Sequence, residues 1–115
     1  MSDASRVYHL PHHRLRAYGV ALELLAVRLA RITDRKLEDE AMRAAKSACL
    51  NIAEGAGRRT RADKARAYAI ARGEAGEACA AVEIAVLSGQ AFAPALARVL
   101  QLGANLTTML TRLLV

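Results

Sequence analysis

The spacing of apolar residues most constrains the fold of this chain, because every long segment follows the period of an α-helix. The clearest case is residues 12–32, where apolar side chains recur at intervals of three and four residues. The members of this heptad stripe are Leu15, Tyr18, Leu22, Leu25, Leu29 and Ile32. A second stripe, on the opposite side of the same segment, consists of Val20, Leu24 and Val27. The pattern predicts one continuous helix opened by Pro11, and one monomeric core cannot cover both of its stripes.

Three more helices follow from the same reading. A polar turn at residues 33–36 precedes an alanine-rich helix, which predicts close approach to its neighbours. Thr60, with Asp63 three residues later, is a helix N-cap pattern, and Ser88, Gly89 and Gln90 end the helix that it begins. The four predicted helices span residues 12–32, 37–54, 61–87 and 94–114.

Four helices of ~20 residues with short connections, and no strand pattern, predict an all-α fold: an antiparallel up-down-up-down four-helix bundle. We expect the bundle domain over residues 12–115, after a flexible N-terminal segment at residues 1–11. The composition agrees, with 54% hydrophobic and 3% aromatic residues in 115. The apolar faces are wider than one bundle core requires, which favours a homo-oligomer that buries the second stripes.

No segment predicts export or membrane insertion. The first residues contain no apolar run typical of a secretory signal. The longest uncharged stretches, residues 84–97 and 99–111, are shorter than the ~18–20 residues of a membrane span. We therefore expect a cytoplasmic protein without membrane contact, in which Cys49 and Cys79 are small buried hydrophobes.

The charge of the chain favours a polyanionic partner. The formal net charge is +6 and the sequence pI is about 10.0, which is typical of nucleic-acid binding, although arginines can also simply solvate helix faces. The densest segment, residues 58–66, contains five bases and one acid, a net charge of +4: the bases are Arg58, Arg59, Arg61, Lys64 and Arg66. Gly55 and Gly57 are expected to let the backbone turn, so that these side chains fan out from one corner of the bundle. Arg72 and the arginines of the first helix are expected to assist.

The remaining polar residues are expected to have structural rather than catalytic roles. Asn51 and Glu54 are expected to bond to a neighbouring helix or to backbone freed near Gly55, because no second acid, nucleophile or metal cluster accompanies them. Glu77 lies between Ile70 and Ile84 at seven-residue spacing, so it needs a cation from the Gly-Arg-Arg segment or from an adjacent subunit. The alternative for Glu77 is a half-exposed side chain that reaches water.

The sequence predicts neither a catalytic site nor a cofactor. His9, His12 and His13 lack an accompanying acid or cysteine, so we expect no metal there. The glycines do not match a phosphate-binding loop of nucleotide hydrolases, which requires a preceding strand and Gly-Lys-Ser/Thr. We expect a protein that is not an enzyme.

Several short motifs resemble one known family. They are Asn51–Gly55 (NIAEG), Gly57–Arg59 (GRR), Ala71–Glu77 (ARGEAGE) and Glu83–Ala85 (EIA). They look like the small helical proteins known from open reading frames in 23S rRNA intervening sequences, with which the accessory proteins of bacterial diversity-generating retroelements are grouped. The resemblance covers roughly residues 12–90.

This resemblance implies an up-down four-helix bundle that assembles as a ring-shaped pentamer. It also implies a basic surface that binds nucleic acid and, in the retroelement branch, the reverse transcriptase. Together with the charge pattern, it leads to one main hypothesis: a non-enzymatic bundle that binds RNA or DNA phosphates and serves as an accessory scaffold. The alternative hypothesis is a protein-interaction module whose basic corner docks an acidic partner without nucleic acid.

Overall fold

The computed structural model describes residues 9–115, and all regular structure in this range is helical. The elements are the 3₁₀ helix η1 (Pro11–Arg14), α2 (Arg16–Glu23), the 3₁₀ helix η2 (Leu24–Ala30), α3 (Arg35–Gly57), α4 (Arg61–Leu87) and α5 (Ala95–Leu113). The predicted all-α bundle of four packed helices is therefore confirmed. The expectation of a flexible N-terminal segment concerns mainly residues 1–8, which lie outside the described residues.

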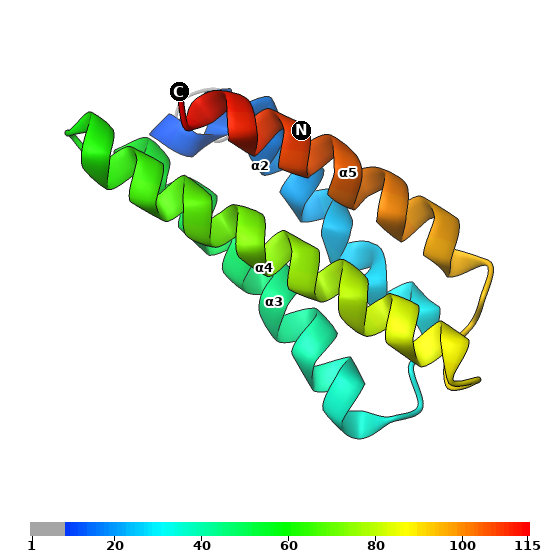
Figure 1. Ribbon diagram of the computed structural model, residues 1–115. Helices are drawn as coiled ribbons and strands as arrows, with labels where there is room; N and C mark the ends of the chain where they lie inside the picture. The colour runs from blue at the N-terminus through cyan, green and yellow to red at the C-terminus, as the bar shows by residue number, and fades with distance from the viewer. Residues whose placement is uncertain (1–8) are drawn as a thin grey trace.

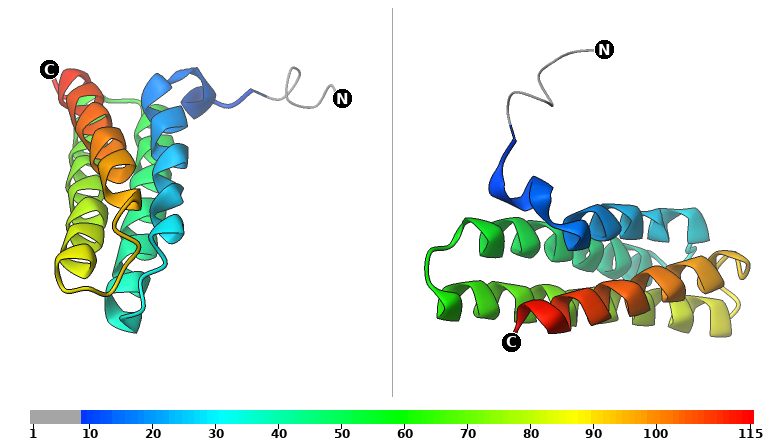
Figure 2. Two further views of the ribbon diagram at one scale, coloured as in Figure 1. Left: turned by 90° about the vertical axis from the view of Figure 1, so that its right-hand side faces the viewer. Right: turned by 90° about the horizontal axis from the view of Figure 1, so that it is seen from above.

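The helices lie lengthwise beside one another, and their connections fall at the two ends of the molecule (Figures 1 and 2). α3 packs along α4, α4 along α5, and α2 contacts both α3 and α5. The connection from α3 to α4 lies at one end. The connections from η2 to α3 and from α4 to α5 lie at the other end, where the Thr33 N–H donates to the carbonyl of Gln90 over 2.8 Å.

The first predicted helix is not continuous. Leu15 has an extended backbone (φ −89°, ψ 123°) that separates η1 from α2, and the helix tightens into η2 after Glu23. Leu24, Val27 and Ala30 are the buried residues of η2. Their spacing of three matches the three residues per turn of a 3₁₀ helix, so the tighter winding keeps all three side chains on the core side. An α-helix would rotate them progressively away from one another.

The two apolar stripes of this segment differ in how deeply they are buried. Leu24 and Val27 of the second stripe are fully buried, whereas Leu22 and Leu29 of the heptad stripe are 43% and 64% exposed. Leu15, Tyr18 and Leu25 of the heptad stripe are half-buried and pack against the core, so this stripe is exposed in part. Only Ile32, at its end, is buried.

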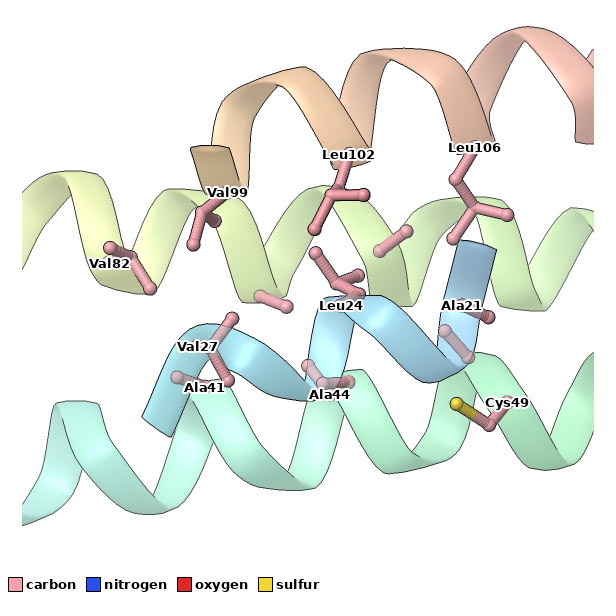
Figure 3. Close-up of a cluster of buried hydrophobic side chains, with 14 of the residues drawn as sticks. Ala21, Leu24, Val27, Ala41, Ala44, Cys49, Val82, Val99, Leu102 and Leu106 are labelled. Atoms are coloured by element: carbon pink, nitrogen blue, oxygen red, sulfur yellow. The ribbon is translucent and has the colours of Figure 1, made fainter. Parts of the chain in front are cut away.

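The core is made of small side chains on two helices and larger ones on the others. α3 and α4 contribute mainly alanines, such as Ala41 and Ala44, which allow the two backbones to approach closely. Leu24 and Val27 lie between these alanines and the side chains of α5, as Figure 3 shows. The prediction that the alanine-rich face reflects close helix approach is confirmed.

Helix ends follow the sequence signals closely. Asp34 caps α3, because its Oδ1 accepts a hydrogen bond from the Leu37 N–H at 2.9 Å, so this helix begins two residues before its predicted start. Gly89 has a φ of 74°, the left-handed conformation that ends α4 after Leu87 as predicted.

Both cysteines are free, with Cys49 buried and Cys79 half-buried. None of the helices in residues 9–115 is both long enough and apolar enough to cross a membrane.

Candidate nucleic-acid interface

The connection between α3 and α4 is short and basic. α3 ends at Gly57, Arg58 is extended, and α4 begins at Arg61. The Thr60 Oγ1 accepts a hydrogen bond from the Asp63 N–H at 3.1 Å, which confirms the predicted N-cap. The reversal of the chain therefore takes place at Arg58, Arg59 and Thr60, and both arginines are exposed.

The two glycines before this connection do not make the turn, so that expectation is wrong. Gly55 and Gly57 both lie inside α3, and neither has a positive φ. Gly55 serves packing instead, because a Cβ at this position would lie 2.6 Å from Cε1 of Tyr68. A Cβ at Gly57 would meet nothing within 4 Å. The absence of a side chain at Gly55 thus allows α4 to approach α3 beside the basic turn.

The side chain of Lys64 binds to the C-terminal end of α3. Its Nζ donates to the carbonyl oxygens of Ala56 at 3.0 Å and of Gly55 at 3.3 Å. These carbonyls belong to the last turn of a helix, where a cation is favoured, and the Gly55 carbonyl also accepts a hydrogen bond from the Arg58 N–H at 3.2 Å. The basic segment predicts Lys64 as a nucleic-acid ligand, whereas in this structure it caps a helix.

An acidic residue shares the basic corner. The Nη2 of Arg58 lies 3.3 Å from the Glu54 Oε2, and both side chains are about half exposed. A hollow of about 310 Å³ lies beside this pair, with Arg66 and Asp63 on its rim and Ile70 in its lining. The carboxylates offset part of the positive charge here, so Arg58 and Arg66 are less available to a polyanion than the sequence of the segment suggests.

Arg59 and Arg61 are exposed at the turn and the first position of α4. The ion pairs among residues 9–115 involve other arginines: Arg43, Arg58 and Arg98. Arg72 is also exposed, but it follows Arg61 by about three helical turns along α4. Arg72 therefore lies on the flank of the bundle, away from the turn.

The fold adds arginines that the sequence segment alone does not contain. The start of α2 and the end of α5 lie in the half of the molecule that ends in the turn between α3 and α4, and the α3–α4 pair projects beyond both of them (Figures 1 and 2). Arg14 and Arg16 flank the first of these segments, and Arg112 lies in the second. We call the assembled surface the basic end: it comprises Arg14, Arg16, Arg58, Arg59, Arg61, Lys64, Arg66 and Arg112. In the sequence, the only sign that these added arginines belong to the site is their position near helix termini. That position predicts their place in the molecule only once the direction of each helix is known.

The contacts of Asn51 and Glu54 differ from those expected. The Asn51 Nδ2 donates to the Ser47 carbonyl at 2.9 Å and to the Ser47 Oγ at 3.1 Å, both within α3. Glu54 pairs with Arg58, one turn later. The contacts found for these two side chains are thus local, and packing of Gly55 against Tyr68 joins α3 to α4 instead.

Glu77 has a cationic partner, but it is neither of those expected. Arg43 of α3 donates through Nη2 to Glu77 Oε2 at 2.8 Å and through Nη1 to Glu74 Oε2 at 2.8 Å. Arg43 also bonds to Glu40 in its own helix. One arginine thus holds three carboxylates across the outer side of α3 and α4, and Glu77 remains 58% exposed.

The three carboxylates differ in their pKa values. The hydrogen bond from Arg43 lowers the pKa of Glu74 to about 2. The neighbouring Glu74 raises the pKa of Glu77, first through a hydrogen bond and then through charge repulsion. Arg43 also lowers the pKa of Glu40. The cluster therefore joins α3 and α4 electrostatically. Its residues have a structural role and are not part of the basic end.

The histidines pack locally. The His13 Nδ1 accepts a hydrogen bond from the Leu10 N–H at 3.0 Å, and the His12 ring meets Tyr18 edge to face at a centroid distance of 4.5 Å. Within residues 9–115, no group of three or more His, Cys, Asp or Glu side chains could hold a metal ion.

The chain matches the model of a known protein family. The family model of the 23S rRNA-intervening sequence protein matches residues 16–112, which covers α2 to the last turn of α5. A search among curated proteins found no match to this chain. The family match includes nearly the whole helical bundle and the motifs that suggested the resemblance. The chain belongs to the 23S rRNA-intervening sequence protein family.

Proposed function

We propose that this protein is a non-enzymatic nucleic-acid-binding bundle whose basic end contacts the phosphates of RNA or DNA. The placing of arginines from three separate parts of the chain in one half of the molecule carries this proposal: Arg58 to Arg66 at the α3–α4 turn, and Arg14, Arg16 and Arg112 around one hollow. Guanidinium groups match phosphate oxygens in a bidentate manner. Residues 58–66 contain no aromatic side chain, which favours contact with the nucleic-acid backbone and little readout of sequence there.

The name of the family favours RNA as the first ligand to test, and the net charge favours nucleic acids in general. The family is named for the intervening sequences of 23S rRNA. The net charge of +6 attracts any nucleic acid over a distance set by the salt concentration. A second protein that works on the bound nucleic acid, such as a reverse transcriptase, is the partner proposed for the scaffold.

The proposal includes a ring-shaped homo-oligomer, for which the resemblance to the family suggests five copies. Two separate exposed apolar faces support it. One is the outer face of α2 and η2, on which Leu22 and Leu29 are exposed, and the other is the outer side of α3 and α4, on which Leu50, Ile70 and Ile84 are exposed around the Arg43 cluster. Leu50 is 70% exposed and Ile84 54%. Two unlike faces that bind each other make a head-to-tail contact, which closes into a ring when the rotation allows it.

Binding to a fluorescein-labelled RNA tests the first part of the proposal. The Arg59→Ala/Arg61→Ala variant should bind on the order of tenfold or more weakly than wild type, since each arginine that is removed leaves one phosphate without its cation. The matched control is Arg35→Ala/Lys36→Ala, which removes the same charge from the exposed start of α3 at the opposite end. Equal reductions of affinity in the two variants would contradict a binding surface at the basic end. Binding of an acidic peptide with no binding of RNA would favour the alternative hypothesis.

Native mass spectrometry tests the oligomer separately. Leu29→Glu and Ile84→Glu alter the two faces one at a time, and each should dissociate the assembly, because a buried unpaired carboxylate is costly. Val115→Glu, at the 93% exposed last residue, is the control. A wild-type protein that remains monomeric at micromolar concentration would overturn the ring.

A further inference from the structure

A second hollow at the basic end combines arginines with an apolar lining. It has a volume of about 310 Å³, at the lower end of the range of ligand-binding pockets. The side chains that line it come from the start of α2 and the end of α5: Arg14, Leu15, Arg16, Ala17, Met109, Arg112 and Leu113. No acid is among them, in contrast to the hollow beside Arg58, which Glu54 and Asp63 line.

The backbone explains how the arginines and the apolar residues are separated. Leu15 alone is extended between η1 and α2, and the side chain of an extended residue points away from those of its two neighbours. Arg14 and Arg16 are accordingly exposed, while Leu15 is half-buried and Ala17 is buried. Across the hollow, Met109 and Arg112 are three residues apart on one face of α5. The result is a hollow with an apolar floor and a cationic rim.

This arrangement fits a ligand with an anion joined to a flat apolar surface. A nucleotide unit has both parts: its phosphate matches the guanidinium groups, and its base can stack on a guanidinium plane or lie against aliphatic side chains. A base within a duplex is stacked and paired, and it must be unstacked before it can enter such a site. We infer that the hollow between α2 and α5 holds one unpaired nucleotide, so that the protein binds single strands in preference to duplexes. This inference rests on the proposed binding of nucleic acid at the basic end.

Three labelled probes test the inference: a short oligothymidylate, an abasic strand of the same length, and a duplex of that length. The abasic strand keeps the phosphates and lacks the bases, so the difference between the first two probes measures what the bases contribute. We expect wild type to bind the oligothymidylate on the order of tenfold more tightly than the abasic strand. The duplex should bind more weakly than the oligothymidylate.

Variants on α5 connect this difference to the hollow. Met109→Gln makes the floor polar without changing the charge, so the oligothymidylate should lose its advantage while the abasic strand binds as before. Leu100→Gln is the control, since Leu100 is 37% exposed on the same helix and does not line the hollow. Arg112→Gln should weaken binding of both strands, whereas Arg98→Gln, on the same helix but outside the hollow, should not. Circular dichroism melts establish that each variant is folded.

The outcomes separate this inference from the proposed function. If the oligothymidylate and the abasic strand bind equally well, the nucleotide site is wrong and phosphate binding stands. If the duplex binds as tightly as the oligothymidylate, the preference for single strands is wrong. If no probe binds, the proposed function fails and the inference fails with it.

Discussion

The ring of Tyr68 occupies the space that a side chain at Gly55 would need. A Cβ at residue 55 would lie 2.6 Å from Cε1 and 2.8 Å from Cδ1 of this ring, and Tyr68 is only 5% exposed. The ring cannot move far because it is enclosed by the core. This contact fixes how closely α4 approaches α3 directly before the basic turn, so it positions Arg58 and Arg59.

The Gly55→Ala variant should therefore be destabilised. We expect a decrease of about 1–3 kcal/mol in the free energy of unfolding, the usual cost of an overpacked core. Urea denaturation followed by circular dichroism measures this decrease. The matched control is Gly57→Ala, which should be neutral or more stable by up to about 1 kcal/mol, since alanine has the higher helix propensity and space is available.

A double mutant tests whether the Tyr68 ring is the cause. In a Tyr68→Leu background, the additional effect of Gly55→Ala on the free energy of unfolding should shrink, because the smaller side chain leaves room for the methyl group. An unchanged effect would show that the cost arises elsewhere in α3.

Gly103 and Cys79 form a similar contact between α5 and α4. The Cys79 sulfur lies against the position that a Cβ of Gly103 would take, so Gly103→Ala should also lower the free energy of unfolding by about 1–3 kcal/mol. Cys79→Ala removes the sulfur and should restore part of that stability in the double variant. A double variant that is less stable than both single variants would contradict this explanation.

Lys64 and Arg61 should have separable roles. Lys64→Met removes the hydrogen bonds to the Gly55 and Ala56 carbonyls, so the free energy of unfolding should fall by about 1 kcal/mol. Arg61→Met should weaken binding to RNA with little effect on stability. Thermal melts and binding titrations on both variants measure the two effects, and the reverse pattern would assign Lys64 to the ligand.

The Arg43 cluster predicts part of the acid sensitivity of the fold. Because the pKa of Glu74 is lowered from 4.5 to about 2, its ion pair stabilises the protein fully above pH 4.5, and this stabilisation is lost as the pH falls towards 2. Glu74→Gln should lower the melting temperature at pH 7 and flatten its dependence on pH between 4.5 and 2.

Glu77→Gln is the control for this prediction. The raised pKa of Glu77 gives the opposite dependence of stability on pH. Its contribution to the free energy of unfolding is present below the ordinary pKa of a glutamate and is lost as the pH rises through the raised value. This variant should keep or raise the melting temperature at pH 7. A decrease as large as that of Glu74→Gln would contradict the assigned pKa directions.

Much of the fold was predictable from apolar periodicity. The helices α4 and α5 end within a residue of their predicted bounds, because Thr60, Gly89 and Pro94 are strong boundary signals. The division of the first helix into η1, α2 and η2 was not predictable, because both sides of this segment are apolar. The spacing of Leu24, Val27 and Ala30 fits either an α-helix or a 3₁₀ helix. Which stripe faces the core depends on tertiary packing, which periodicity does not contain.

The candidate site was predictable only in part. The exposed Arg59 and Arg61 follow from the basic segment, but Gly55 and Gly57 look alike in the sequence and only the position of Tyr68 separates their roles. Arg43 and Lys64 found partners on other segments of the chain. Arg14, Arg16 and Arg112 come together because the start of α2 lies beside the end of α5, which requires knowledge of the fold.

The salt dependence of RNA binding tests the central proposal most directly. For wild type, the logarithm of the binding constant should fall linearly with the logarithm of the salt concentration. Arg59→Ala/Arg61→Ala should reduce the slope by about two, because each of the two arginines neutralises one phosphate, whereas Arg35→Ala/Lys36→Ala should leave the slope unchanged. A wild-type binding constant that does not change with salt, or a slope equal in all three proteins, would contradict phosphate binding at the basic end.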